Sequence, residues 1–273
     1  MKKIILMIAA AVLSAGIMSA QSTLAEATEI FNQGAQAFQG ENLTGALELF
    51  QKALSVGEAL NAEEEGVTDL VGNCKDAITK VSMKIARGLI KESKYDEALT
   101  KLGEVASLAE NYGIDEIATE AKGLIPQVMM KKGDSLLNAA QSATDVTAKK
   151  NGLLAAATVY KEVYQADSTN GVAALRLGQV LSLTGYADEA LDAFKAAAAN
   201  GQDNVAKKEA AKLFLRQADA ANKSKKYADA ISFVNKSEEF GEVSPQAYRI
   251  AGRASQNLNK VNDPIKYFNK YLE

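Results

Sequence analysis

The sequence predicts an all-α protein built from a repeated pair of helices. One submotif recurs at a spacing of 34 residues, since Ala156 and Tyr160 are repeated as Ala190 and Phe194, each pair being followed three residues later by a smaller residue. Positions i, i+4 and i+7 lie on one helix face. The 273 residues include only three prolines and are rich in alanine, leucine and lysine, which favours helix. A repeat of this length predicts a solenoid.

A first helix precedes this submotif and packs closely against it. Gly178 stands twelve residues before Ala190, with Leu177 and Leu181 beside it. The same helix pair is found in further copies along the sequence, and we therefore expect about five to six helix hairpins. These copies comprise Gly34, Phe38, Ala46, Phe50 and Ala53; Ala86, Leu89, Tyr95, Ala98 and Leu102; Phe214, Ala218, Tyr227, Ala230 and Val234; and Tyr248, Gly252, Pro264, Phe268 and Tyr271.

Three features predict local departures from the regular pattern. In the last copy Pro264 replaces the expected alanine, and it fits only in the first turn of the second helix, behind two residues suited to capping. Pro126 either kinks a long helix or starts a new one. The copy led by Gly133 has a polar stretch, residues 141–150, before its second helix. This stretch predicts a lengthened loop.

Residues 186–197, Tyr-Ala-Asp-Glu-Ala-Leu-Asp-Ala-Phe-Lys-Ala-Ala, resemble the tetratricopeptide repeat. Related stretches stand at residues 94–99, Lys-Tyr-Asp-Glu-Ala-Leu, and 226–231, Lys-Tyr-Ala-Asp-Ala-Ile. The resemblance covers the sequence from about residue 25 to its last residue. It implies a right-handed helix-hairpin solenoid over residues 21–273, whose first helices line a concave side. The family binds many unrelated protein and peptide partners.

The first twenty residues predict a secretory signal peptide. Two lysines precede the apolar run of residues 4–13, and small residues follow it up to Ala20. We expect cleavage after Ala20, with cleavage after Ser22 as the alternative. An uncleaved anchor is a weaker alternative, because a membrane-spanning helix needs about 20 apolar residues. The sequence therefore predicts an exported protein, periplasmic or secreted, with no membrane span in residues 21–273.

The charge of the protein is unevenly distributed. Residues 21–120 contain 18 acidic and 8 basic residues, whereas residues 121–273 contain 16 acidic and 21 basic residues. The two halves could bind different partners, or the charges could simply lie on solvated helix surfaces. The basic excess is modest, and export removes the protein from nucleic acid, so we expect no nucleic-acid partner.

Composition argues against catalysis. Histidine is absent, which removes the commonest general base and excludes nucleophile pairs and zinc sites that depend on histidine. Cys74 is the single cysteine, so no intramolecular disulfide can form, and we expect its thiol to be buried in a helix. We find no phosphate-binding loop and predict no enzyme activity, no metal and no cofactor.

The predicted first helices of the last two hairpins offer a basic surface. Its candidate partner-binding residues are Lys212, Arg216, Lys223, Arg249 and Arg253. The forked donors of arginine suit a carboxylate-bearing partner, such as an acidic peptide or the C-terminus of a polypeptide. The alternative is that these cations pair with neighbouring Asp and Glu, or face water.

Aromatic residues mark two further candidate surfaces. Phe31 and Phe38 stand seven residues apart on the predicted first helix, and they could bind a partner helix or strand. Such a pair can equally pack in the core or close the end of the solenoid. The last helix carries Tyr267, Tyr271 and Leu272, which predicts either a docking surface or a contact between two copies.

We interpret the protein as a non-enzymatic scaffold of the bacterial envelope that binds protein or peptide segments on its concave face. The alternative is a structural or assembly factor that forms homo-oligomers through its solenoid ends. A third interpretation, an enzyme or small-molecule binder that uses carboxylates in a cleft, would need acidic pairs with perturbed pKa values in a pocket. Nothing in the spacing of the acidic residues indicates such a pair.

Overall fold

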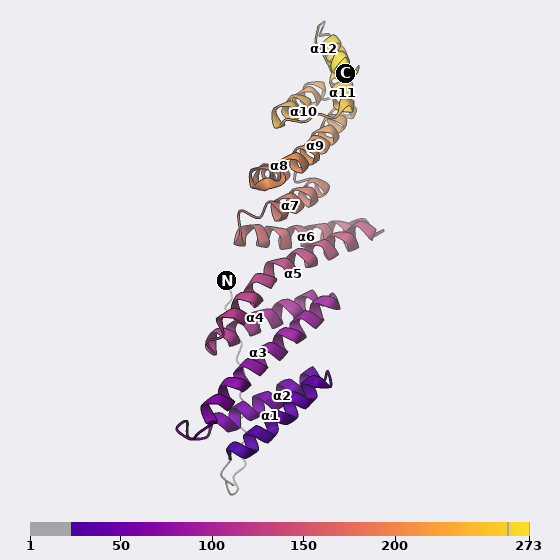
Figure 1. The fold of residues 1–273 in the computed structure, drawn as a ribbon. Coiled ribbons are helices and arrows are strands. Elements are labelled where there is room, and N and C mark those ends of the chain that lie inside the picture. The colour runs from indigo at the N-terminus through magenta and orange to yellow at the C-terminus, as the bar shows by residue number, and fades with distance from the viewer. Residues whose placement is uncertain (1–22, 261, 273) are drawn as a thin grey trace. The chain divides into compact units, whose positions relative to one another are not determined.

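The computed structural model describes residues 23–260 and 262–272, and these residues form helices joined by short connections (Figure 1). The prediction of an all-α helix-hairpin protein is confirmed, since the described residues include no strand. In sequence order the helices are α1 (Leu24–Gln39), α2 (Leu43–Glu58), α3 (Val67–Lys91), α4 (Tyr95–Asn111), α5 (Asp115–Ser142), α6 (Val146–Ala166), α7 (Gly171–Thr184), α8 (Ala187–Ala197), α9 (Asp203–Lys223), α10 (Tyr227–Phe240), α11 (Pro245–Asn257) and α12 (Asp263–Leu272).

The protein forms two compact units. The first unit contains the described residues up to 85 together with residues 107–118, and the second contains residues 86–106 and the described residues from 119 onward. Helices α3, α4 and α5 each contribute to both units. The predicted repeat array, residues 21–273, includes both.

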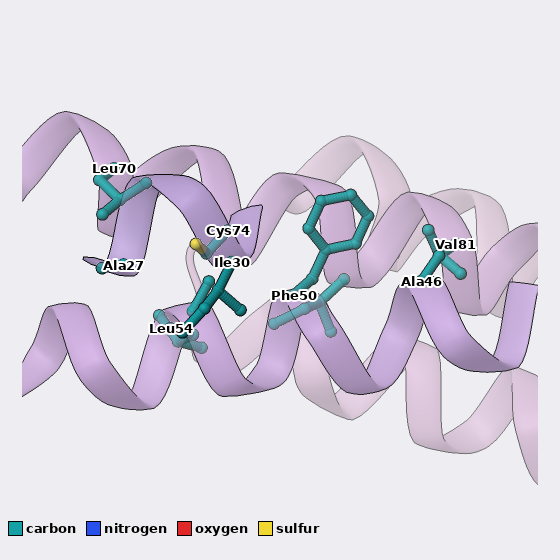
Figure 2. Close-up of a cluster of buried hydrophobic side chains, with 10 residues drawn as sticks. Ala27, Ile30, Ala46, Phe50, Leu54, Leu70, Cys74 and Val81 are labelled. Carbon is teal, nitrogen blue, oxygen red and sulfur yellow. The ribbon is translucent and has the colours of Figure 1, made fainter. Parts of the chain in front are cut away.

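In the first unit the core lies among α1, α2 and α3. Ile30 of α1, Phe50 and Leu54 of α2, and Cys74 of α3 are buried together (Figure 2). These residues recur on one face of each helix, as an amphipathic pattern requires. The prediction that Cys74 is buried is confirmed.

Four of the hairpins close through a glycine that packs against an aromatic ring. A Cβ atom added to Gly34 would lie 2.9 Å from the ring of Phe50, and one added to Gly178 would lie 2.7 Å from the ring of Phe194. The same contact joins Gly252 to Phe268 and Gly133 to Tyr160. In these four hairpins the small-and-aromatic pattern of the sequence therefore specifies where the first helix crosses the second.

Several helices are preceded by a residue whose polar side chain caps the first turn. Asn42 Oδ1 accepts a hydrogen bond of 3.1 Å from the Gly45 N–H at the start of α2, and Asn170 Oδ1 accepts one of 3.0 Å from the Ala173 N–H at the start of α7. These caps satisfy backbone donors that have no partner inside the helix.

One local prediction is wrong. Residues 141–150 do not form a long loop, because α5 continues to Ser142 and α6 begins at Val146. Asp145 caps α6, and its Oδ1 accepts a hydrogen bond of 2.7 Å from the Ala148 N–H. Residues 144–151 are all exposed, so the first two turns of α6 carry none of the apolar periodicity by which sequence indicates a helix.

Pro126 lies inside a helix, and Pro264 lies at the start of one. Pro126 lies within α5, so the first alternative, a single long helix, is correct. Pro264 is buried in the first turn of α12, as predicted.

Among the described residues, no helix is both long and apolar enough to cross a membrane. The predicted signal peptide, residues 1–20, lies outside the described residues.

Candidate functional site

The predicted basic surface lies on α9 and α11, two first helices of the second unit that contact each other. Two of its lysines are already paired within α9. Lys212 Nζ lies 2.8 Å from Glu209 Oε1, and Lys223 Nζ lies 2.6 Å from Asp219 Oδ2. For these two residues the structure agrees with the alternative of local pairing. Exposed pairs of this kind stabilise a helix by only about 0.3–0.5 kcal/mol, so a partner could displace them.

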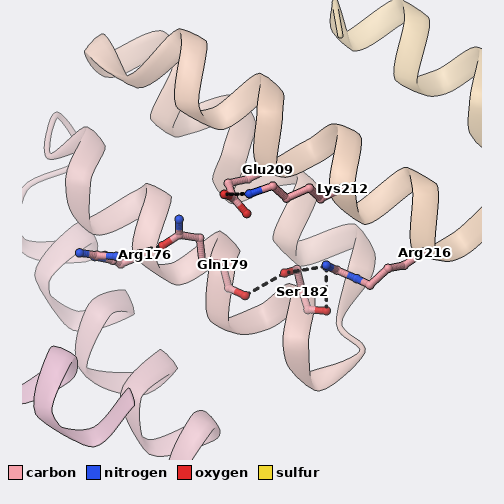
Figure 3. Close-up of polar contacts among 6 residues, drawn as sticks. All are labelled: Arg176, Gln179, Ser182, Glu209, Lys212 and Arg216. Atoms are coloured by element: carbon pink, nitrogen blue, oxygen red, sulfur yellow. Dashed lines mark hydrogen bonds and ion pairs between the residues drawn. The ribbon is translucent and has the colours of Figure 1, made fainter. Parts of the chain in front are cut away.

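Arg216 connects α9 to the preceding first helix, α7. Its Nη2 donates a hydrogen bond of 3.1 Å to Ser182 Oγ and makes a longer contact of 3.5 Å with the Ser182 carbonyl oxygen (Figure 3). That carbonyl belongs to the last turn of α7, where backbone oxygens lack helical partners and carry partial negative charge. The guanidinium of Arg216 is therefore partly occupied by intramolecular contacts.

A row of polar contacts continues along α7 towards α5. Ser182 Oγ donates a hydrogen bond of 2.8 Å to the Gln179 carbonyl oxygen, and Arg176 Nη1 donates one of 3.2 Å to Gln179 Oε1 (Figure 3). Arg176 Nε also lies 3.5 Å from Asp134 Oδ1 on α5. Residues from three successive first helices are thus linked through their polar side groups.

Asp134 connects this row of polar contacts to a buried residue of the core. The buried Tyr160 of α6 donates a hydrogen bond of 2.7 Å from its hydroxyl to Asp134 Oδ1. Burial of the ring raises the pKa of Tyr160 well above its usual value, and the hydrogen bond to Asp134 adds to this effect. Tyr160 therefore stays protonated and acts as a donor that orients the Asp134 carboxylate.

A polar hollow of about 400 Å³ adjoins Asp134. It is lined by Tyr95, Lys131, Asp134, Ser135 and Asn138. Sequence reasoning missed both Asp134 and Arg176. Alignment of the repeats on their glycines could have identified Asp134, because it directly follows Gly133 as Gln179 follows Gly178.

Arg249 and Arg253 differ from the other cations of the surface. Neither guanidinium forms an ion pair or a side-chain hydrogen bond with any residue that the structure describes. Arg253 is exposed and Arg249 is half-buried. Their spacing of four residues places them on one face of α11, one turn apart.

Phe31 and Phe38 lie in the first unit and are both half-buried. The ring centroid of Phe31 lies 5.1 Å from that of Phe50, at an interplanar angle of 51°. Lys84 Nζ lies 4.7 Å from the ring centroid of Phe38. Both rings pack against the core cluster, so their contacts agree with the alternative of a packed pair.

Two observations on the described residues concern metal binding and the reactivity of the single cysteine. They contain no group of three or more acidic, cysteine or histidine residues that could hold a metal ion. Cys74 is fully buried, and burial, together with the charge of Glu58, raises the pKa of its thiol to about 11. A thiol in this environment is a poor nucleophile at neutral pH.

The fold and this surface define a protein built of repeated helix hairpins, in which polar side chains link the first helices α5, α7 and α9. No protein-family model matches the sequence, and no curated protein is similar to it. Several solved structures are similar to this protein. The MamA protein is 18% identical over 71% of this chain and 90% of its own, with a TM-score of 0.39.

Two further solved structures are similar to this protein. TTC0263, a thermophilic TPR protein of Thermus thermophilus, is 17% identical over 85% of this chain and 99% of its own, with a TM-score of 0.32. YrrB, described as a TPR protein with an unusual peptide-binding site, is 13% identical over 93% of this chain and 92% of its own, with a TM-score of 0.26. These values are low, so we base the class on the packing within the protein's own hairpins.

Proposed function

We propose that this protein is a non-enzymatic scaffold that binds segments of partner proteins on the first-helix face of α9 and α11. The observation that carries this proposal is the contrast between the cations on that face. Lys212 and Lys223 are neutralised within α9, whereas Arg249 and Arg253 have no acidic partner among the described residues. A rigid helix that presents two uncompensated guanidinium groups is suited to binding anions.

The chemistry of the face favours a carboxylate-bearing partner. Arginine donates two parallel hydrogen bonds to a carboxylate, which adds geometric specificity to the charge attraction. The basic excess of residues 121–273 would attract an acidic segment over a longer range. We therefore expect an acidic peptide segment or the C-terminus of a polypeptide, bound with an affinity that falls as salt rises.

We place this scaffold in the bacterial envelope. The support is the predicted signal peptide of residues 1–20. A periplasmic or secreted location also agrees with a protein that has a single, buried cysteine. Detection of a protein that begins at Gln21 or Thr23 in the periplasmic or secreted fraction would test this part of the proposal.

Affinity capture from envelope extract tests the partner. The bait is the protein from Gln21 onward, compared with the variant R249E/R253E. The matched control is K149E/K150E, which makes the same charge change on the exposed first turns of α6. We expect one dominant, acidic partner that the control retains and the arginine variant loses. Equal capture by all three baits would remove the arginine face from the proposal.

Self-assembly is the second candidate function, and α12 provides the observation for it. Ile265 is 62% exposed and Leu272 is 79% exposed, which is unusual for two large apolar side chains on one short helix. Light scattering over a range of concentrations tests this function. A mass that rises with concentration, and that I265E/L272E returns to the monomer value, would favour assembly over the scaffold.

A further inference from the structure

One side of α12 exposes large apolar side chains to solvent. Ile265 is 62% exposed, Leu272 is 79% exposed and Tyr271 is 38% exposed. Ile265 and Leu272 stand seven residues apart, which places them two turns apart on one face of the helix. Phe268, between them, is half-buried.

The earlier hairpins show that this side of a second helix is normally covered. Pro264 is equivalent to five alanines, because each stands four residues before an apolar residue of its hairpin core; they are Ala46, Ala98, Ala156, Ala190 and Ala230. All residues equivalent to Ile265 are buried or half-buried, and these are Leu47, Leu99, Ala157, Leu191 and Ile231. The same is true of the residues equivalent to Leu272, which are Leu54, Ala106, Tyr164, Ala198 and Glu238. The exposed apolar residues of α12 therefore occupy positions that are covered in all five earlier second helices.

The cover is provided by the first helix of the next hairpin. Ile231 of α10 lies in one buried cluster with Ala247 and Ala251 of α11. Leu191 of α8 packs against a cluster that includes Leu213 of α9. No later helix is described beside α12, so its equivalent surface has no such cover among the described residues.

Helix α1 lacks the residues that would allow it to cover α12 of another copy. Gly34 of α1 and Gly252 of α11 are equivalent, because each packs against a ring of its second helix. At four covering positions α11 has Ala247, Ile250, Ala251 and Ala254, which are all buried, whereas α1 has Glu29, Asn32, Gln33 and Gln36, which are all exposed. A polar outer face of this kind keeps the end of a solenoid soluble. Head-to-tail stacking of α1 on α12 is therefore disfavoured.

The charges on α12 are largely neutralised within the protein. Asp263 Oδ2 lies 3.2 Å from Lys260 Nζ, and Lys270 pairs with Glu238 of α10. Lys266 is the one other charged residue between 263 and 272. An apolar surface with so little net charge neither attracts an acidic peptide nor repels an identical copy.

We propose that this side of α12 binds the same side of α12 in a second copy of the protein, which forms a closed dimer. In an antiparallel pair of helices, Ile265 of each copy faces Leu272 of the other, so the surface is complementary to itself, as a two-fold interface requires. The polar face of α1 limits the assembly to two copies, because it offers no apolar surface to a third. This inference rests on self-assembly, the second candidate function, and specifies its partner surface and its size.

The expected dimer is weak. Helix α12 has 10 residues, so its exposed side is about 15 Å long. A stable dimer usually buries about 800 Å² on each partner, which is more than one side of so short a helix provides. We therefore expect a dissociation constant on the order of 10–100 μM.

Sedimentation equilibrium of residues 21–273, from about 1 μM to about 1 mM, tests the proposal. We expect the mass to rise from one copy to two and to remain there. The variant I265E/L272E should weaken dimerisation at least about 100-fold, because it places four carboxylates in the contact. The matched control V146E/A148E adds the same charges at exposed positions of α6, where Val146 is 81% exposed, and should dimerise normally.

A pair of cysteine variants tests which helix forms the contact. N269C places a thiol on the exposed side of α12, and mild oxidation should cross-link two copies through it. Q36C places a thiol on the exposed face of α1 and should not cross-link. Cys74 does not interfere, because it is fully buried.

A grafted variant tests the role assigned to α1. The variant E29A/N32I/Q33A/Q36A gives α1 the four covering residues of α11. It should stack on α12 of another copy and form assemblies larger than a dimer. If it remained a dimer, α12 would not be an uncovered repeat junction and the proposal would be wrong.

Three further results would overturn the proposal. A mass of one copy at every concentration would leave α12 to a different protein, and a mass above two copies in the unmodified protein would show an open-ended contact. Cross-linking of Q36C as readily as N269C would place the contact elsewhere. The variant R249E/R253E should dimerise normally, and I265E/L272E should retain the partner of the arginine face, so failure of the proposed scaffold is distinguishable from failure of this dimer.

Discussion

Substitution of Gly178 by alanine tests the glycine–aromatic packing that four of the hairpins share. The added Cβ atom would lie 2.7 Å from two ring carbons of Phe194 and 3.1 Å from the backbone carbonyl oxygen of Ala190. Phe194 is fully buried, so the ring cannot move aside without opening the core. We expect the substitution to force α7 and α8 apart.

The magnitude follows from two opposing contributions. Overpacking of a dense core costs about 1–3 kcal/mol, and the rigid neighbours of Gly178 favour the upper half of this range. Alanine in a helix is about 1 kcal/mol more favourable than glycine. The net expectation is a loss of about 1–2 kcal/mol in the free energy of unfolding.

Gly103 provides the control, because it lies in α4 with no atom within 4 Å of an added Cβ. Gly103→Ala should stabilise the protein by about 1 kcal/mol through helix propensity alone. The assay is urea unfolding followed by far-UV circular dichroism, with midpoints and slopes compared because repeat arrays can depart from two-state behaviour.

A double-mutant cycle isolates the contact itself. Phe194→Leu removes the ring carbons, so Gly178→Ala should cost less in that background, with a coupling energy of about 1 kcal/mol or more. The reasoning would be refuted if Gly178→Ala stabilised the protein as much as Gly103→Ala does.

Three further predictions concern single side chains. Tyr160→Phe removes the hydroxyl that donates to Asp134, and urea unfolding should show a loss of about 1–2 kcal/mol. Cys74, with a buried thiol of pKa about 11, should react with a disulfide reagent at pH 8 only when the protein unfolds. Burial opposes ionisation of Glu238, but hydrogen bonds, above all one from Lys270, outweigh it and lower its pKa below the usual 4.5. The resulting stabilisation is complete above pH 4.5 and is lost as pH falls through the lowered pKa of the folded state, so Glu238→Gln should make stability less dependent on pH below 4.5.

Each of these predictions has a control close by. Tyr164→Phe on the same helix should change stability by less than about 0.5 kcal/mol. If Cys74 in the folded protein reacted with the reagent as fast as it does in the urea-unfolded protein, this result would contradict its burial. Glu239→Gln alters an exposed neighbour and should leave the acid dependence of unfolding as in the unmodified protein. If the stability of Glu238→Gln depended on pH below 4.5 as that of the unmodified protein does, Lys270 would contribute no stability through this carboxylate.

Much of the fold was predictable because its signals are local. The spacing of twelve residues between Gly178 and Ala190 specifies a first helix, a turn and a second helix that cross at the glycine. The position of Pro264 in a first turn follows from the missing N–H of proline. The start of α6 was not predictable, because its first turns are solvent-exposed and carry no apolar pattern.

The residues of the candidate site and its pairs within α9 were predictable from the sequence, but its contacts between helices were not. The positions of Arg216, Arg249 and Arg253 on successive first helices follow from the repeat register. The contact of Arg216 with Ser182 joins residues 34 positions apart, and it depends on how closely α7 and α9 approach. The link from Arg176 to Asp134 is equally non-local, and sequence reasoning missed it.

Periodicity within one or two helices was enough to specify the helix hairpins, their order and the burial of their small and aromatic residues. The three-dimensional packing was needed to show that Arg216 is held by Ser182 of a neighbouring helix, whereas Lys212 and Lys223 pair locally within α9. It was also needed to show that Ile265 and Leu272 of α12 are exposed, although their equivalents in the earlier hairpins are covered. Polar contacts such as Arg216 to Ser182 and Arg176 to Asp134 depend on distances between helices, and the packing of each hairpin on the next sets those distances.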